Sequence, residues 1–115
     1  MTRHRQLLGA SGENKVAAWY QARGYEVLSR NWRRREGELD LVLGADGLVV
    51  FCEVKTRTSD AFGAPAEAVT RVKQARLRRL AAQWLGEHGG GRRGEVRFDV
   101  AAVLGGDVEV LEGAF

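Results

Sequence analysis

Residues 48–56 have the sequence Leu48-Val49-Val50-Phe51-Cys52-Glu53-Val54-Lys55-Thr56, an apolar run that carries two opposite charges near its end. Side chains alternate between the two faces of a strand, so Glu53 and Lys55 share one face. The apolar residues before them occupy both faces, which is typical of a strand covered on both sides. Buried charges are costly unless they are paired or bind a metal. The run therefore predicts a central strand with a paired or metal-binding site at its end.

A second carboxylate is expected beside this strand end. Residues 38–43 form another apolar run that contains Asp40, with twelve residues between Asp40 and Glu53. Residues 44–47, Gly-Ala-Asp-Gly, have hairpin chemistry, so the two strands should be antiparallel neighbours. Mg²⁺ prefers oxygen ligands, which Asp40, Glu53 and the carbonyl of Val54 would supply. Lys55 would hold or help to deprotonate an attacking water, or stabilise the transition state.

The other elements are predicted from periodicity and turn residues. A helix is expected over residues 7–23, ended by Gly24, and a strand over residues 25–31. A basic turn should follow at residues 32–37. A second helix is expected over residues 65–88, beginning at Pro65, and two strands over residues 95–104 and 108–111. The order α-β-β-β-α-β-β, with helices on both sides of one mixed sheet, predicts an α/β fold. The inward residues of the second helix should be Val69, Leu77, Leu80, Ala81, Trp84 and Leu85.

Composition narrows the class of protein. The 115 residues fit a single domain over residues 1–115. Cys52 is the one cysteine and falls in a buried strand, which fits a reducing cytoplasm. No segment is apolar for long enough to span a membrane, and no signal-peptide core follows the N-terminus. The net charge of +3 permits an anionic partner. Among the 18 basic residues only Lys15, Lys55 and Lys73 are lysines; the excess of arginine suits phosphate contacts, but a G+C-rich genome gives the same bias.

The motifs together resemble those of the YraN family of small bacterial proteins, which are regarded as predicted endonucleases. The family pattern is a helical G-x-x-G-E, then G-E-[IL]-D-L, then [FV]-x-E-V-K-[TS]-R, then a helical lysine, then R-F-D-V. In this chain the matching segments are residues 9–13, 37–41 and 51–57, Lys73, and residues 97–100. The match covers nearly the whole chain, and the order and spacing of its motifs are specific.

The wider resemblance is to the restriction-endonuclease-like PD-(D/E)xK nucleases, which include archaeal Holliday-junction resolvases. It implies an αβββαβ core with the active site at one edge of the sheet. It also implies that Asp40 is the metal-binding aspartate, that Glu53 and Lys55 are the (D/E)xK pair, and that Glu13 is the glutamate contributed by the first helix in the resolvases. Leu39 stands where the superfamily name has proline, as in many members that lack it.

These expectations combine into a Mg²⁺-dependent endonuclease, with Mn²⁺ as a substitute, that hydrolyses DNA phosphodiester bonds. A basic rim should contact phosphates without reading sequence, which predicts recognition of DNA structure such as a junction or branch. A homodimer would suit a junction, which has two strands to cut. The predicted rim consists of Arg33, Arg34, Arg35, Arg57 and Lys73.

Each predicted site residue also has a structural alternative. Glu53 and Lys55 could form a salt bridge on a solvated rim, and Glu13 could pair with Lys15, Lys73 or a basic loop. Glu38 shares the face of Asp40 and could bind a metal, but it is expected instead to pair with or cap the loop of Arg33 to Arg35. Asp99 is expected to pair with Arg97. Lys73 could contact phosphate or form a structural pair. Two other functions remain: a nucleic-acid-binding module with the nuclease fold but little turnover, and an interaction protein in which the motif is a relic.

Overall fold

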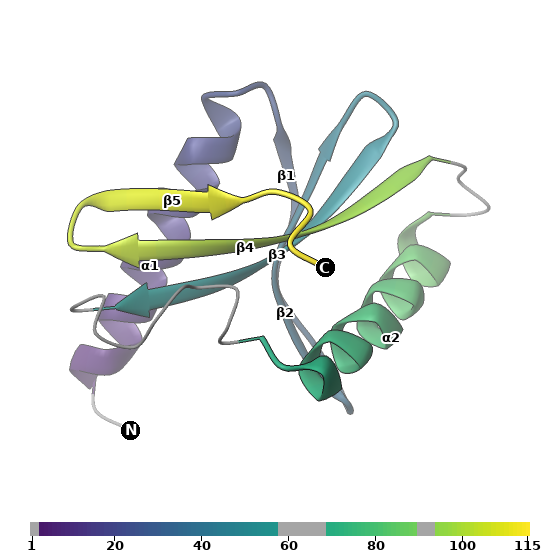
Figure 1. Cartoon of the computed structure of the whole chain (residues 1–115), viewed down its shortest axis with the longest axis horizontal. Coiled ribbons are helices and arrows are strands. Elements are labelled where there is room, and N and C mark those ends of the chain that lie inside the picture. The colour runs from purple at the N-terminus through teal and green to yellow at the C-terminus, as the bar shows by residue number, and fades with distance from the viewer. Residues whose placement is uncertain (1–2, 58–68, 90–93) are drawn as a thin grey trace.

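The computed structural model describes residues 3–57, 69–89 and 94–115. In this part of the chain two helices and five strands follow one another in the predicted order (Figure 1). Neither of these helices combines the length and the apolar character needed to cross a membrane. The elements are α1 (Arg3–Gln21), β1 (Glu26–Arg34), β2 (Gly37–Ala45), β3 (Leu48–Arg57), α2 (Arg71–His88), β4 (Glu95–Leu104) and β5 (Asp107–Leu111).

The five strands form one mixed sheet in the spatial order β1-β2-β3-β4-β5. β3 and β4 are parallel, and α2 lies in the connection between them, which is the usual way to join parallel strands. The other neighbouring pairs are antiparallel. Figure 1 shows the two helices on opposite sides of the sheet. The predicted α/β fold with a helix-flanked mixed sheet is therefore confirmed.

Alternation along β3 divides the core into two layers, one on each side of the sheet. Val49 and Phe51 pack in the layer beneath α2, whereas Val50 and Cys52 pack in the layer beneath α1. β3 is therefore covered on both faces, as its apolar sequence predicted. The α2-side layer also contains Val69, Leu77, Leu80, Ala81 and Trp84, with Leu85 at its edge, and these are the predicted inward residues of the second helix.

The predicted turns are confirmed. β2 and β3 are joined by Asp46 and Gly47, whose φ angles of +31° and +80° fit the two-residue turn that best matches strand twist. Gly24 follows α1 with a φ of +89°, a left-handed conformation that glycine adopts without a Cβ penalty.

Three predicted boundaries were wrong. β1 continues to Arg34 and the basic turn is shortened to Arg35 and Glu36, because Trp32 is buried beneath α2 and the strand stays paired with β2. α2 begins only at Arg71, where the Thr70 side chain caps the helix by accepting the Lys73 N–H at 3.2 Å. The predicted start at Pro65 lies outside the described residues. α1 begins at Arg3, earlier than expected.

Asp99 is a fully buried carboxylate in the α1-side layer. Arg97 donates to it from Nε and Nη2 at 2.8 and 2.9 Å, the Tyr20 hydroxyl donates at 2.5 Å, and the Gly113 N–H donates at 3.0 Å. The expected ion pair of Arg97 with Asp99 is confirmed. With four donors, this carboxylate joins α1, β4 and the C-terminal residues.

Replacing Tyr20 by Phe should destabilise the protein, because it removes one donor from a buried charge. Hydrogen bonds to charged groups contribute about 1.5–3 kcal/mol, so we expect chemical denaturation to show a loss of that size. Tyr25→Phe is the matched control. The Tyr25 hydroxyl accepts from Arg97 Nη2 at 3.2 Å in a half-buried position, so its loss should cost less. Equal losses in the two variants would contradict the role assigned to Asp99.

Candidate active site

The sheet opens at Asp40. Pairing of β2 with β3 runs from Ala45 opposite Leu48 to Leu41 opposite Cys52 and ends there, although β3 stays paired with β4 as far as Arg57. We call this opening the fork: it separates β2 before Leu41 from β3 after Cys52.

The faces of β2 also exchange at Asp40. Leu39 packs in the α2-side layer and Leu41 in the α1-side layer, although residues two apart in a regular strand share one face. On β1, Arg30 pairs with Leu41 and Trp32 with Leu39, which leaves Asn31 opposite Asp40, and Asn31 has a φ of +51°. The backbone irregularity and the fork therefore coincide at one residue.

Asp40 spans the fork with its side chain. Its Oδ2 accepts the backbone N–H of Val54 at 2.9 Å, in place of a main-chain partner. The N–H and C=O of a strand residue point to the same side, so the Val54 carbonyl also faces the fork. The structure thus puts Asp40 beside the carbonyl that the sequence predicted as a metal ligand.

Glu53 directly precedes Val54 on β3, and its side chain is 9% exposed. Lys73 Nζ, from the first turn of α2, lies 3.4 Å from Glu53 Oε1, and Lys55 Nζ lies 3.9 Å from the same oxygen. The predicted Glu53–Lys55 pair is present, but it is partly buried and is shared with a second lysine. Lys73, predicted as a rim residue, belongs to this carboxylate site.

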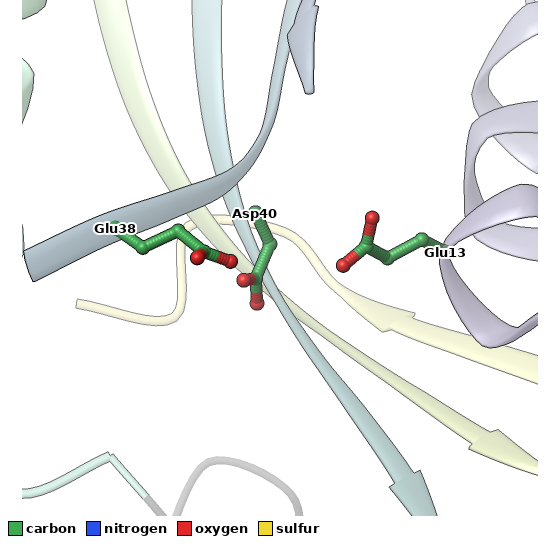
Figure 2. A group of neighbouring side chains, drawn as sticks. All are labelled: Glu13, Glu38 and Asp40. Carbon is green, nitrogen blue, oxygen red and sulfur yellow. The ribbon is translucent and has the colours of Figure 1, made fainter. Parts of the chain in front are cut away.

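Three carboxylates meet at Asp40. One oxygen each from Glu13, Glu38 and Asp40 lies within 4.8 Å of the other two. Figure 2 shows the carboxyl groups of Glu13 and Glu38 directed toward Asp40 from opposite sides. Glu13 Oε1 is buried without a hydrogen-bond partner among the described residues, and its ion pair with Arg30 is long, at 3.8 Å.

The electrostatics of the group favour a bound cation. Burial, and then the neighbouring Glu53, raise the pKa of Asp40 to about 8. Burial also raises the pKa of Glu13. Burial and the adjacent Lys73 lower the pKa of Lys55. Burial acts to lower the pKa of Lys73 as well, but the hydrogen bond with Lys55 and the charge of Glu53 outweigh it, so this pKa is raised.

The donor set fits Mg²⁺ or Mn²⁺. It consists of carboxylate and carbonyl oxygens, which hard divalent cations prefer. Glu13 Oε1 has no hydrogen bond within the described part of the chain and the pKa of Asp40 is raised, and both observations mark a place where a cation would stabilise negative charge. Asp40, Glu53 and the Val54 carbonyl could hold the ion directly, with Glu13 and Glu38 beside them.

The cavity next to the carboxylates is small. It measures about 10 Å³ and is lined by Asp40, Glu53 and apolar side chains that include Leu39 and Phe51. That volume accommodates about one water molecule. A larger ligand must therefore approach the carboxylates from the solvent side of the fork.

Two residues of the predicted basic rim, Arg33 and Arg34, pair with glutamates. Arg33 donates to Glu38 Oε2 from Nε at 3.2 Å and from Nη2 at 2.7 Å, which confirms the expected pairing of Glu38. Arg34 forms an ion pair with Glu87 of α2. Arg35 is exposed in the turn after β1, and Arg57 ends β3.

Glu38 was predicted to pair with the loop of Arg33 to Arg35, with metal binding as the alternative, and the structure has it both in the carboxylate group and paired with Arg33. One contribution was missed by the sequence analysis. Arg30 pairs with Glu13, and nothing in the sequence distinguishes it from the other arginines.

Gly12 allows α1 to approach the strand end. A Cβ at this position would lie 2.2 Å from Thr56 Oγ1, so only glycine fits without movement of the strand residue. The next residue is Glu13, and this close contact therefore fixes how far Glu13 reaches toward Asp40.

Comparisons with known proteins give the family. Residues 12–103 match the family described as "Uncharacterised protein family UPF0102". A UPF0102 protein of Beutenbergia cavernae is 58% identical over 102 residues, which cover 89% of this chain and 86% of the relative. A UPF0102 protein of Frankia alni is 50% identical over 118 residues, which cover 98% of each chain. A UPF0102 protein of Clavibacter michiganensis is also 50% identical, over 119 residues that cover 99% of each chain.

The change in the free energy of unfolding caused by Gly12→Ala should change sign when Thr56 is replaced by alanine. Overpacking costs about 1–3 kcal/mol, whereas replacing a helical glycine by alanine gains about 1 kcal/mol. We expect Gly12→Ala alone to lower the free energy of unfolding, but to raise it in a Thr56→Ala background, where Oγ1 is absent. Chemical denaturation of the four proteins measures both effects. The same change in both backgrounds would show that the contact is not tight.

The raised pKa of Asp40 should make the cation-free protein less stable as pH rises. Between about pH 4, the usual value for an aspartate, and about pH 8, the unfolded chain ionises Asp40 while the folded protein keeps it protonated. Folding is therefore opposed increasingly across this interval. Asp40→Asn keeps an acceptor for Val54 but cannot ionise. In chelator, its stability relative to the wild type should increase from pH 4 to pH 8; a constant difference would contradict the raised pKa.

Proposed function

The chain belongs to the uncharacterised family UPF0102, and we propose that it is a metal-dependent endonuclease that hydrolyses DNA phosphodiester bonds. Membership agrees with the resemblance to YraN-like proteins. One observation carries the proposal: at the fork the carboxylates of Asp40 and Glu53 are neighbours beside the Val54 backbone, with Glu13 next to Asp40 and Lys55 next to Glu53. The αβββαβ order and the PD-(D/E)xK resemblance of these residues support it.

The chemistry requires a water aimed at phosphorus and stabilisation of charge on the phosphoryl oxygens. Mg²⁺, with Mn²⁺ as a substitute, would act as a Lewis acid and make its bound water more acidic. Asp40, Glu53 and the Val54 carbonyl would hold the ion at the mouth of the fork. Because the cavity next to them is so small, the phosphodiester would enter from the solvent side.

The two lysines have different proposed roles. Lys55 has a lowered pKa, so its amine is the better acceptor of a proton and would orient or help to deprotonate the attacking water. Lys73 has a raised pKa and stays charged, so it would hold Glu53 in place and stabilise negative charge on the phosphoryl group. Glu13, from the opposite face of the sheet, would accept a hydrogen bond from the water.

DNA recognition is proposed to depend on structure. Phosphate contacts give affinity without sequence information. Arg35 is exposed beside the turn of β1 and is suited to such a contact, and Arg57 ends the strand that carries Glu53. A four-way junction or another branched DNA is the proposed substrate, and a homodimer would place one site on each of two strands.

A second candidate is a nucleic-acid-binding module with little turnover. It is favoured by one observation, namely that both lysines already neutralise Glu53. If that ion-pair cluster were stable in the presence of a divalent cation, Glu53 would not become a metal ligand.

Cleavage of labelled DNA tests the proposal. The panel contains a four-way junction, flap, nicked duplex, duplex and single strand, with Mg²⁺ or Mn²⁺ at low salt. We expect cleavage of branched DNA by the wild type, and a loss of at least about a hundredfold in Asp40→Asn and Lys55→Ala, the scale of one general acid–base or electrostatic contribution. Asp46→Asn, in an exposed hairpin turn that asparagine also suits, is the matched control and should keep full activity.

The outcomes separate the two candidates. Cleavage that survives in folded Asp40→Asn would show that another protein or another site is responsible. DNA binding without cleavage on every substrate would favour the binding module. Retention of a native circular dichroism spectrum by each variant is the necessary control for folding.

A further inference from the structure

We propose that Arg33 couples cation binding to nucleic-acid binding. In the absence of a cation it holds Glu38, and when Glu38 turns to a divalent cation at the fork, the guanidinium is released to a phosphate of the substrate backbone. This inference rests on the proposed function, because it takes a phosphodiester as the anionic partner.

Arg33 and Glu38 stand at the boundary between solvent and the carboxylate group. They face each other across β1 and β2, and two guanidinium nitrogens donate to the same oxygen of Glu38. The Arg33 side chain is 77% exposed, whereas that of Glu38 is 29% exposed. One end of the pair is therefore accessible to a large anion, and the other end reaches Asp40 and Glu13 (Figure 2).

Arg33 and a divalent cation bound in the carboxylate group would compete for the negative charge of Glu38. Its carboxylate lies in the group that also contains Asp40 and Glu13, whose buried Oε1 has no hydrogen bond among the described residues. A divalent cation there attracts Glu38 more strongly than one guanidinium can, because exposed ion pairs with arginine are weak. Any shift of Glu38 toward the cation lengthens its bonds to Arg33.

The released guanidinium suits a phosphate. Its planar fork of donors matches phosphate oxygens and cannot lose its charge at neutral pH. Because Arg33 is exposed and its partner Glu38 lies in the carboxylate group, the phosphate it would bind is one close to the bond that is cut. Cation and nucleic acid would then each increase the affinity of the protein for the other, as thermodynamic linkage requires.

Arg34 provides the matched comparison. It is the next residue on β1 and also pairs with a glutamate, but its partner Glu87 lies on α2 and is not in the carboxylate group. Releasing Arg34 should therefore change nucleic-acid affinity without changing its dependence on the cation. Arg33→Gln and Glu38→Gln therefore form the test pair of variants. Arg34→Gln and Glu87→Gln form the matched control pair.

The first measurement is the Mn²⁺ affinity of the free protein by isothermal titration calorimetry. Arg33→Gln should bind Mn²⁺ about two- to fivefold more tightly than the wild type, the range expected for loss of one competing exposed ion pair. Glu38→Gln should bind Mn²⁺ more weakly. Arg34→Gln and Glu87→Gln should match the wild type. Unchanged Mn²⁺ affinity in Arg33→Gln would overturn the proposal.

The second measurement is the affinity for a labelled four-way junction by fluorescence anisotropy, in chelator and in Ca²⁺. The wild type should gain affinity from Ca²⁺, and in Arg33→Gln the ratio of the affinities in Ca²⁺ and in chelator should be much smaller than in the wild type. Glu38→Gln should bind the junction more tightly than the wild type in chelator. An equal Ca²⁺ effect in Arg33→Gln and Arg34→Gln would overturn the coupling.

These results are independent of turnover. If the wild type cleaves DNA and Arg33→Gln behaves like Arg34→Gln, the proposed nuclease activity stands and only the proposed coupling is rejected. Cation-coupled binding without cleavage would support the coupling and favour the binding module. Absence of junction binding in both conditions would overturn the coupling, and the cleavage panel would decide separately on the nuclease.

Discussion

The hydrogen bond from the Val54 N–H to Asp40 Oδ2 is the interaction on which the site depends. It replaces a rung of the β2–β3 ladder at the place where that pairing ends, and it lets β3 continue beside β4 alone. Because a side chain makes this bond, the two strands separate and expose a carbonyl and two carboxylates between them. A regular ladder would have used these backbone groups for sheet pairing and left no space for a ligand.

The fork also allows residues from both faces of the sheet to meet. Glu13 belongs to α1 and lies beside Asp40, whereas Lys73 belongs to α2 on the other face and pairs with Glu53, which is also a neighbour of Asp40. Each helix is fixed locally: Gly12 permits the close approach of α1 to Thr56, and Thr70 caps α2 so that Lys73 lies in its first turn. An unbroken sheet would keep the two sets of side chains apart.

The sequence was sufficient where structure is local. Alternation in β3, the Asp46-Gly47 turn and the stripe of α2 identified the sheet centre and its neighbours, and they placed Asp40, Glu53 and Lys55 together. The end of β1 could not be predicted from local pattern, because Trp32 is held by tertiary burial. The start of α2 has a local signal in the cap of Thr70, but the start was predicted from Pro65 instead. The period of two indicated Glu38 as a possible metal ligand beside Asp40, although pairing with the arginine loop was preferred, and the structure shows Glu38 in both positions. A strict period of two cannot show that β2 exchanges faces at Asp40.

Two aspartates in this fold show how surroundings separate structure from function. Asp99 is fully buried, but it receives four hydrogen bonds and pairs with Arg97, so its charge is fully compensated. Asp40 receives one backbone N–H, and among the described residues no lysine or arginine lies within ion-pair distance of it. Its neighbours Glu13, Glu38 and Glu53 each have a basic partner. A divalent cation at the fork would displace the proton of Asp40 and draw these carboxylates away from their partners, and the basic side chains set free would then face the solvent side from which a polyanion must approach.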